Sequence, residues 1–496
     1  MKQKDFVINL ILLIFLNLLI KPFWLFGIDL GVQNRVGAAD YGLYAAIFSF
    51  TFLFNALLDM GVTSFNNRNI ARHNQLLQKH FSGILGLKLG LGVCYLLISF
   101  VVGAIIGYRD LQLKLLFWTA INQFLNAFIL YLRSNISALL MFKTDALLSV
   151  LDRLLIILIC GILLWGNVIK QPFQIEWFVY SQTVAYLIAA IVAFAVVAAN
   201  SGFRKPSWNR PFFIMILKKS FPFALLYLLM SCYNRVDSVM IERLLGDNAA
   251  YQTGIYASAF RLLDALVMIS YLFSVILLPL FSKMLKNKEN IIPIIKTSFS
   301  LLFYFSVTVT ILLIIYRMPI LSQLYPDHPE ETAQVFRFLI PCIIPISLTY
   351  IFGTLLTANE NLKLLNITSL IGIILNFSAN FLLIPKLYAQ GAAITSLATQ
   401  SLIALIQIFI VVRILKLPLK KLPFLRALVY LLLFIPISFL TFNYLQVNVW
   451  LQILILGIIS LSLAFLTGLL SVKFLKEFIP SETERKRNES PAYNKS

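Results

Sequence analysis

Long apolar runs constrain this chain more than any other feature of its sequence. A helix needs about 20 mostly apolar residues to cross the hydrocarbon core of a bilayer. Fourteen runs of that kind follow one another along the 496 residues. They predict an all-α integral membrane protein with about fourteen transmembrane helices. The predicted spans are approximately 7–28, 41–61, 81–107, 113–137, 146–168, 175–199, 218–241, 254–282, 294–318, 334–357, 362–385, 390–415, 424–445 and 449–472.

The composition supports a membrane protein and excludes a soluble nucleic-acid binder. Hydrophobic residues make up 60% of the chain and charged residues only 12%, against about 25% charged residues in soluble domains. The net charge of +20 therefore has too little polar surface around it for a nucleic-acid partner. The four cysteines form no CxxC pair and the three histidines lie in polar segments. A metal or haem site in the membrane would lack its usual nitrogen ligands, so we expect no cofactor beyond a coupling Na⁺ or H⁺.

The distribution of basic residues predicts the orientation. With a cytoplasmic N-terminus and alternating spans, and with basic residues in the first or last four positions of a span counted with the adjoining segment, cytoplasmic segments hold 27 Lys and Arg residues and outer segments hold 8, as the positive-inside rule requires. The first run is long and no small-x-small cleavage site follows it, so we expect it to remain as a helix. Residues 473–496 are polar and predict a disordered cytoplasmic tail, so both termini are cytoplasmic.

An internal repeat predicts two similar halves. Residues 36–46 (VGAADYGLYAA) and 245–258 (LGDNAAYQTGIYAS) each place a glycine after one span and Gly-Leu/Ile-Tyr-Ala at the start of the next. Six spans separate the copies, so both have the same orientation and form a parallel repeat. We therefore expect a first lobe at 1–200, a second lobe at 211–416 and a terminal helix pair at 424–472. Two such lobes suit alternating access.

Three segments give the chain a family resemblance. They are VGAADYGLYAAIFSFTFLFNALLDMGVTSFNNRNIAR (36–72), NRVDSVMIERLLGDNAAYQTGIYASAFRLLD (234–264) and GIILNFSANFLLIPKLYAQGAAITSLATQ (372–400). With them the chain resembles polysaccharide transporters, including O-antigen flippases, of the multidrug/oligosaccharidyl-lipid/polysaccharide exporter (MOP) superfamily. The resemblance implies a flippase, not an enzyme, in the bacterial inner membrane. It would move an undecaprenyl-diphosphate-linked oligosaccharide, such as an O-antigen, capsule or exopolysaccharide unit, to the periplasmic leaflet. A glycan polymerase and a chain-length regulator are the partners implied in lipopolysaccharide biosynthesis, beside membrane lipids.

Ionisable side chains inside the predicted spans are functional candidates, because each costs free energy in a bilayer. Cations at two depths could hold a diphosphate first while the cavity faces inward and then while it faces outward. Lys21 directly precedes Pro22, which predicts a kink in the first helix. The alternative is structural: some cations could reach the interface, and acidic side chains could neutralise their neighbours. The candidates for diphosphate binding are Lys21, Lys88, Arg133, Arg153, Arg235 and Arg261, and the charge-pair candidates are Asp59, Asp152 and Asp264.

A second group suggests the coupling ion. Asn376 and Asn380 are four residues apart and share one helix face. Together with Asp237 and Thr395 they offer hard oxygen ligands suited to Na⁺. Superfamily members that resemble this chain include ones with a sodium site on the equivalent helices of the second lobe. Interhelical hydrogen bonding by the asparagines and proton coupling through Asp237 are the alternatives.

Three other functions remain open at this stage. A peptidoglycan-precursor flippase and a multidrug or cation antiporter belong to the same superfamily. A membrane glycan polymerase or ligase is the alternative from another class. Such enzymes usually need catalytic side chains in a sizeable outer loop, and the largest predicted outer loop carries only a short cluster, which we interpret as a solvated acidic turn. Its members are Asp327, His328, Glu330 and Glu331.

Overall fold

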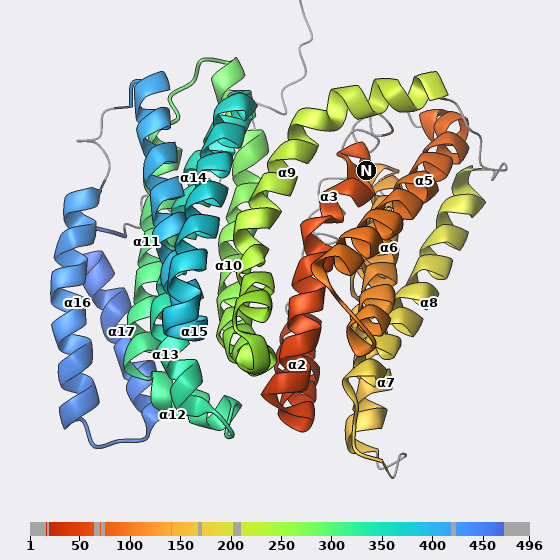
Figure 1. Ribbon diagram of the computed structural model, residues 1–496. Helices are drawn as coiled ribbons and strands as arrows, with labels where there is room; N and C mark the ends of the chain where they lie inside the picture. The colour runs from red at the N-terminus through yellow and green to blue at the C-terminus, as the bar shows by residue number, and fades with distance from the viewer. Residues whose placement is uncertain are drawn as a thin grey trace, which may run out of the picture. The chain divides into compact units, whose positions relative to one another are not determined.

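The computed structural model describes residues 19–63, 75–139, 141–166, 171–201, 210–417 and 423–470, together with Leu16 and Ile70. Within these ranges the regular structure is helical and contains no strand, as Figure 1 shows. The prediction of an all-α fold is therefore confirmed. The elements are η1 (Phe23–Asp29), α2 (Leu30–Leu53), α3 (Asn55–Asp59), α5 (Gln75–Ile106), α6 (Leu111–Ala138), α7 (Phe142–Trp165), α8 (Ile175–Ser201), α9 (Arg210–Leu244), η2 (Gly246–Asn248), α10 (Ala249–Lys286), α11 (Ile292–Ile315), α12 (Arg317–Leu324), α13 (Pro329–Leu339), η3 (Ile340–Cys342), α14 (Ile343–Ala358), α15 (Leu362–Ile414), α16 (Phe424–Tyr444) and α17 (Val449–Leu466).

Eleven helices in the described ranges are long and apolar enough to cross a membrane. Two of these contain a break in the backbone, at Gly37 and at Tyr388, where two helices meet. Each therefore contains segments that the sequence analysis treats as two spans. The predicted span 218–241 lies in α9. The chain is a multi-pass helical membrane protein; the total of fourteen and the cytoplasmic termini stay predictions, and the tail 473–496 lies outside the described residues.

The first helix is longer than its apolar run suggests. The helical path continues from Leu19 through the π-helical segment η1 to the break at Gly37, whose φ is 84°. The helix therefore continues beyond the predicted span 7–28 and includes the buried polar residues Asp29 and Gln33. The π-helix begins directly after Pro22, which lacks the backbone N–H of a regular turn. The irregularity expected beside Lys21 thus takes the form of a widened turn.

The two copies of the sequence repeat cross each other at their glycines. Gly37 and Gly246, the first glycine of each copy, both have positive φ values, 84° and 59°, which glycine adopts without a steric penalty. The second glycines, Gly42 on α2 and Gly254 on α10, lie at the crossing itself. A Cβ atom on Gly42 would overlap the backbone at Ala250 and lie 2.5 Å from the Gly254 nitrogen. The repeat therefore brings two helices into backbone contact.

The chain divides into two compact units. The first comprises residues 1–257 and 373–392, and the second comprises 258–372 and 393–496. The unit boundary runs through α10 and α15. The two copies of the repeat both contribute to the first unit, and the expected division into lobes at 1–200 and 211–416 stays a prediction.

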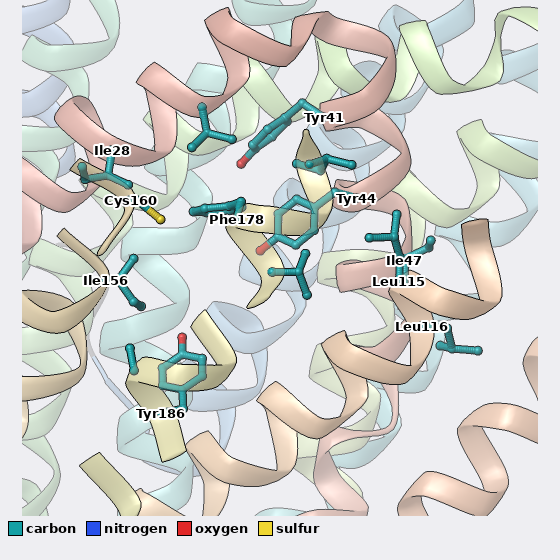
Figure 2. Packing of buried hydrophobic residues seen from close by; sticks show 14 of the residues in the cluster. Ile28, Tyr41, Tyr44, Ile47, Leu115, Leu116, Ile156, Cys160, Phe178 and Tyr186 are labelled. Carbon is teal, nitrogen blue, oxygen red and sulfur yellow. The ribbon is translucent and has the colours of Figure 1, made fainter. Parts of the chain in front are cut away.

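Much of the core of the first unit is an aromatic cluster, shown in Figure 2. Tyr41, Tyr44 and Phe178 are buried there, with the Tyr44 and Phe178 rings meeting edge to face at 5.4 Å. The hydroxyl groups of Tyr44 and Tyr186 point toward each other in Figure 2. This core is thus apolar in bulk but has a line of polar groups inside it.

The terminal helices α16 and α17 pack against α11 in the second unit. Two hydrogen bonds between side chains join them: Thr308 with the Tyr430 hydroxyl at 2.6 Å, and Tyr304 with Ser460 at 3.1 Å. Interhelical hydrogen bonds of this type stabilise helix contacts in membranes. The pair expected at 424–472 therefore docks on one helix of the second unit.

Candidate functional site

Lys88 of α5 is neutralised inside the first unit. Its side chain is only 2% exposed, and its ammonium group forms an ion pair with Asp59. It also donates to the Leu58 carbonyl oxygen and the Thr63 hydroxyl, each at 3.2 Å. The Tyr131 ring lies 5.5 Å from the ammonium nitrogen. With its donors engaged in this way, Lys88 is poorly placed to bind a substrate, and Asp59 has the pairing role.

Arg133 of α6 has a partner that the sequence analysis did not consider. Its Nε donates to Asp145 of α7 at 2.8 Å. Asp145 lies in the first turn of α7, one residue before the predicted span 146–168, so it is not among the ionisable residues inside the predicted spans. A carboxylate in a first helical turn also complements the helix dipole. The sequence signal that could have found it is the acidic residue at a helix start.

Arg153 of α7 lies between two aromatic residues. Its Nη1 donates to the Tyr186 hydroxyl at 2.8 Å, and its guanidinium carbon lies 4.6 Å from the centre of the Trp24 ring. The nearest carboxylate oxygen, of Asp152, is 3.7 Å from Nη1, beyond a normal hydrogen bond. Arg153 therefore retains donors that no carboxylate occupies.

Lys21 belongs to the same cluster. It is half-buried and interacts electrostatically with Arg153, Arg133 and Asp152. Among the described residues, no carboxylate forms an ion pair with Lys21 and no acceptor takes its hydrogen bonds.

Arg235 lies on α9, away from any helix end. Its guanidinium carbon is 5.2 Å from the centre of the Phe52 ring of α2, and it interacts electrostatically with Tyr227. A cation over an aromatic face is stabilised without losing its charge. Arg235 therefore presents a cation at the contact between α2 and α9.

Arg261 and Asp264 lie in the second unit. Arg261 is buried and donates from Nη1 to the Tyr325 hydroxyl at 3.0 Å, while Tyr325 donates to the Ser258 carbonyl oxygen at 3.2 Å. Asp264 is exposed. These bonds tie α10 to the turn between α12 and α13. The pairing of Arg261 with Asp264 stays a prediction.

The structure brings Asp237, Asn376 and Asn380 together. Asp237 of α9 is 1% exposed and both asparagines of α15 are fully buried. The Asp237 Oδ1 atom accepts from Nδ2 of Asn376 at 3.0 Å and from Nδ2 of Asn380 at 2.7 Å. Thr395 is buried too, but lies in the second unit. Three of the four predicted residues therefore form one contiguous polar site.

Tyr256 completes this site and was missed by the sequence analysis. Its hydroxyl donates to Oδ2 of Asp237 at 2.8 Å. Tyr256 is the tyrosine of the Gly-Ile-Tyr motif in the second repeat copy, and Tyr44 of Gly-Leu-Tyr is its counterpart in the first copy. Tyr44 likewise meets a buried polar partner, accepting from Gln182 at 3.1 Å. The repeated Gly-Leu/Ile-Tyr motif was therefore a signal for a polar contact as well as for a turn.

Asp29 is a second missed residue. It is 6% exposed and accepts from the Tyr41 hydroxyl at 2.9 Å. The expected end of the first helix near residue 28 placed it in a loop, where a carboxylate needs no explanation. Its position within the helix makes it a buried ionisable group of the first unit.

The acidic cluster beside α13 has a structural role. Glu330 and Glu331 lie in the first turn of α13, where carboxylates complement the helix dipole. His328 is buried and its Nδ1 lies 2.9 Å from the Thr332 hydroxyl. Burial lowers the pKa of His328, an effect that Asp327 and Glu331 oppose. The buried imidazole contacts the first turn of α13 through the Thr332 side chain, and the interpretation of the cluster as a solvated acidic turn stays a prediction.

No group of three or more His, Cys, Asp or Glu side chains in the described ranges could hold a metal ion. The site at Asp237 contains a single carboxylate, whose oxygens accept hydrogen bonds from Asn376, Asn380 and Tyr256. Its role in binding a coupling ion stays a prediction.

Two family models each match more than half of the chain. "Polysaccharide biosynthesis protein" matches residues 9–285, and "Lipid II flippase MurJ" matches residues 149–465. No curated protein matches the chain in sequence.

Solved structures of transporters share the fold. An inward closed lipid II flippase MurJ aligns with a TM-score of 0.72 and 16% identity, over 95% of this chain and all of the other. An inward-facing multidrug resistance MATE transporter of the MOP superfamily aligns with a TM-score of 0.59 and 12% identity, over 80% of this chain and 96% of its own. An outward-facing multidrug resistance MATE transporter of the MOP superfamily aligns with a TM-score of 0.57 and 14% identity, over 81% of this chain and 93% of its own. At these identities the likeness shows the fold.

Proposed function

Because the chain belongs to the polysaccharide biosynthesis and lipid II flippase families of the MOP superfamily, we propose that it moves an undecaprenyl-diphosphate-linked oligosaccharide across the bacterial inner membrane. The families comprise transporters, so the protein is a flippase for lipid-linked glycans and not an enzyme. The finer proposal concerns the cargo: a repeat unit of O-antigen, capsule or exopolysaccharide. It would cross by alternating access.

The observation that carries the proposal is the excess of positive charge around Lys21 and Arg153. Lys21 lacks a carboxylate partner among the described residues, and Arg153 keeps donors free of carboxylates. A charged group within the membrane is costly unless it pairs. A lipid diphosphate supplies the negative charges that would pair with both, and the planar guanidinium suits phosphate oxygens.

The test compares Lys21→Ala and Arg153→Ala with Lys114→Ala. Lys114 is a cation of the same lobe whose side chain is 52% exposed, which makes it a matched control. We expect loss of surface glycan for the first two variants at unchanged abundance in the membrane, and normal glycan for Lys114→Ala. Arg235→Ala should also abolish transport. Normal glycan export in Lys21→Ala and Arg153→Ala would refute the cationic site.

The Asp237 site is proposed as the coupling site for Na⁺ or H⁺. Asn380 Oδ1 is buried and has no hydrogen-bond partner among the described residues. Half a turn of either side-chain amide would present its oxygen beside the carboxylate in place of its NH₂ group, which would give hard oxygen ligands for Na⁺. With the amides as they stand, their NH₂ groups instead stabilise the ionised Asp237 carboxylate, which is the form that would accept a coupled proton.

The coupling ion can be identified in proteoliposomes. If Na⁺ is coupled, replacing a Na⁺ gradient by choline should abolish flipping, and Asp237→Asn should make flipping independent of Na⁺. If H⁺ is coupled, only a pH gradient should drive flipping. Flipping by Asp237→Asn that responds to both gradients as the wild type does would exclude this site.

A lipid II flippase is the second candidate. It is favoured by the match over residues 149–465 and by the shared fold. Depletion of the resident lipid II flippase in a bacterial host distinguishes the two. Growth rescued by this chain would support lipid II as cargo. Restored surface glycan in a strain lacking its O-antigen flippase, without rescue of growth, would support the first proposal. A glycan polymerase and a chain-length regulator would then be its expected partners.

A further inference from the structure

We propose that the indole N–H of Trp24 donates a hydrogen bond to a phosphate oxygen of the ligand held by Lys21 and Arg153, and that Tyr186 positions Arg153 for the same ligand. This inference deepens the proposed function and rests on it. It adds to the cationic site one neutral donor and one positioning residue that charge alone does not reveal.

Arg153 is held in one orientation by two contacts. The Trp24 ring lies against the guanidinium group, 4.6 Å from its carbon, and the Tyr186 hydroxyl accepts from Nη1 at 2.8 Å. Stacking on an aromatic face and one hydrogen bond together restrict a planar guanidinium. These two contacts restrict the guanidinium group and leave its other N–H groups to an acceptor beside the indole.

Trp24 itself has a donor that the protein does not use. Its Nε1 atom is buried and has no hydrogen-bond partner among the described residues. An indole N–H is usually paired when buried, because an unmade hydrogen bond costs stability. Arg153 covers the face of the ring, so the N–H at the ring edge remains available to an acceptor beside Arg153.

Lys21 and Trp24 are three residues apart in the first helix, so their side chains leave it within one turn of each other. The π-helical segment begins at Phe23, between them. Lys21 interacts electrostatically with Arg153, which places all three groups in one neighbourhood. The helix thus presents an ammonium group and an indole N–H next to a fixed guanidinium group.

The charge of this cluster indicates an anionic acceptor. Arg133 pairs with Asp145, and Asp152 accompanies Arg153 at 3.7 Å. The charge of Lys21 is left without a carboxylate. A phosphate oxyanion accepts from Lys, Arg and indole donors at once and supplies the missing negative charge. A sugar hydroxyl would accept hydrogen bonds but leave the charge uncompensated.

The experiment follows the indole N–H directly. Full-length protein labelled with ¹⁵N at its tryptophan indoles is studied in phosphatidylcholine nanodiscs, and Trp24→Phe identifies the resonance. Farnesyl diphosphate is the probe and farnesol its uncharged control. We expect farnesyl diphosphate, but not farnesol, to move the Trp24 indole proton downfield. Trp24→Phe, which keeps an aromatic face for Arg153, should bind the probe about tenfold more weakly.

Trp118→Phe is the matched control. Trp118 is another partly buried tryptophan packed on the same aromatic core, and its loss should leave affinity unchanged. For Tyr186 the test is a cycle with Arg153→Gln: Tyr186→Phe should weaken binding in the wild-type background and have no effect when Arg153 is absent. Equal losses in both backgrounds would show a structural role for Tyr186 and overturn its assignment.

The phosphate could come from three sources, which the arms of the experiment separate. A shift caused by inorganic pyrophosphate would identify free phosphate, and a shift caused by phosphatidylglycerol nanodiscs alone would identify lipid headgroups. Each of these shifts would support a hydrogen bond from the Trp24 indole N–H to a phosphate oxyanion. A stationary indole resonance with Arg153-dependent binding of farnesyl diphosphate overturns the Trp24 assignment and leaves the proposed function intact. Absence of any farnesyl diphosphate binding by the wild type counts against the proposed function itself.

Discussion

Replacing either crossing glycine by alanine should force α2 and α10 apart. A Cβ on Gly42 would overlap the backbone at Ala250, and a Cβ on Gly254 would overlap the backbone at Ala38. Backbone atoms inside a helix cannot rotate aside as side chains do, so the helices themselves must separate. Each substitution therefore overpacks the crossing, and the added methyl group fits only if the two helix backbones move apart.

The expected magnitude follows from two opposing effects. Overpacking costs about 1–3 kcal/mol, while alanine in place of glycine favours a helix by up to about 1 kcal/mol. Each single variant, Gly42→Ala or Gly254→Ala, should lose about 1–2 kcal/mol of unfolding free energy. The double variant should lose clearly less than the sum, because the first methyl group already creates the space that the second one needs.

The assay is unfolding in mixed micelles of a mild detergent with increasing sodium dodecyl sulfate. Gly457→Ala on α17 is the matched control, because no atom lies within 4 Å of a Cβ built there; it should be neutral or stabilising. Losses that simply add in the double variant, or single variants that behave like Gly457→Ala, would refute a shared backbone contact.

Three further predictions concern single sites. Asp59→Asn should cost about 3 kcal/mol of unfolding free energy because it leaves the buried Lys88 charge unpaired. Lys88→Met should cost less, because the Asp59 side chain is 34% exposed and its charge can be solvated. Equal costs of the two variants in the same assay would contradict this asymmetry. Tyr388→Gly should raise the unfolding free energy of the protein by about 1 kcal/mol, since Tyr388 has φ 54° and ψ −138° inside α15 and glycine adopts such a conformation without strain. A lower unfolding free energy would show that the packing of the tyrosine ring contributes more than the backbone strain costs. Acidification from pH 8 to pH 5 should lower the thermal midpoint of the wild type more than that of His328→Gln. The folded state holds the pKa of His328 below the ordinary value of 6.5, so the stability it contributes is present above that pH and is lost as the pH falls below it; parallel curves for the two proteins would refute this.

Several features could be predicted from single segments of sequence. The first glycine of each repeat copy, Gly37 or Gly246, lies at a position with positive φ, and Asn376 and Asn380 share a face as their spacing indicated. Helix ends were harder: the first helix passes Asp29 because buried hydrogen bonds, here from Tyr41, satisfy a polar residue that hydropathy alone places in a loop.

Partners were the least predictable property of the candidate site. Arg133 pairs with Asp145 rather than with Asp152, and Tyr256 joins Asp237 from another helix. Lys21, Trp24 and Arg153 meet although Arg153 comes from a helix more than 100 residues further along the chain. No local pattern encodes such meetings, because they depend on how helices pack.

The sequence by itself determined that this protein is an all-helical membrane protein. Apolar runs of spanning length must form helices, because a bilayer offers no partner for free backbone N–H and C=O groups. Only the tertiary structure decided which membrane charges are neutralised and which remain available. Lys88 and Asp59 are 29 residues apart, and Asp237 and Asn380 are 143 apart. Electrostatic energy depends on distance in space, so packing alone distinguishes the paired Lys88 from Lys21.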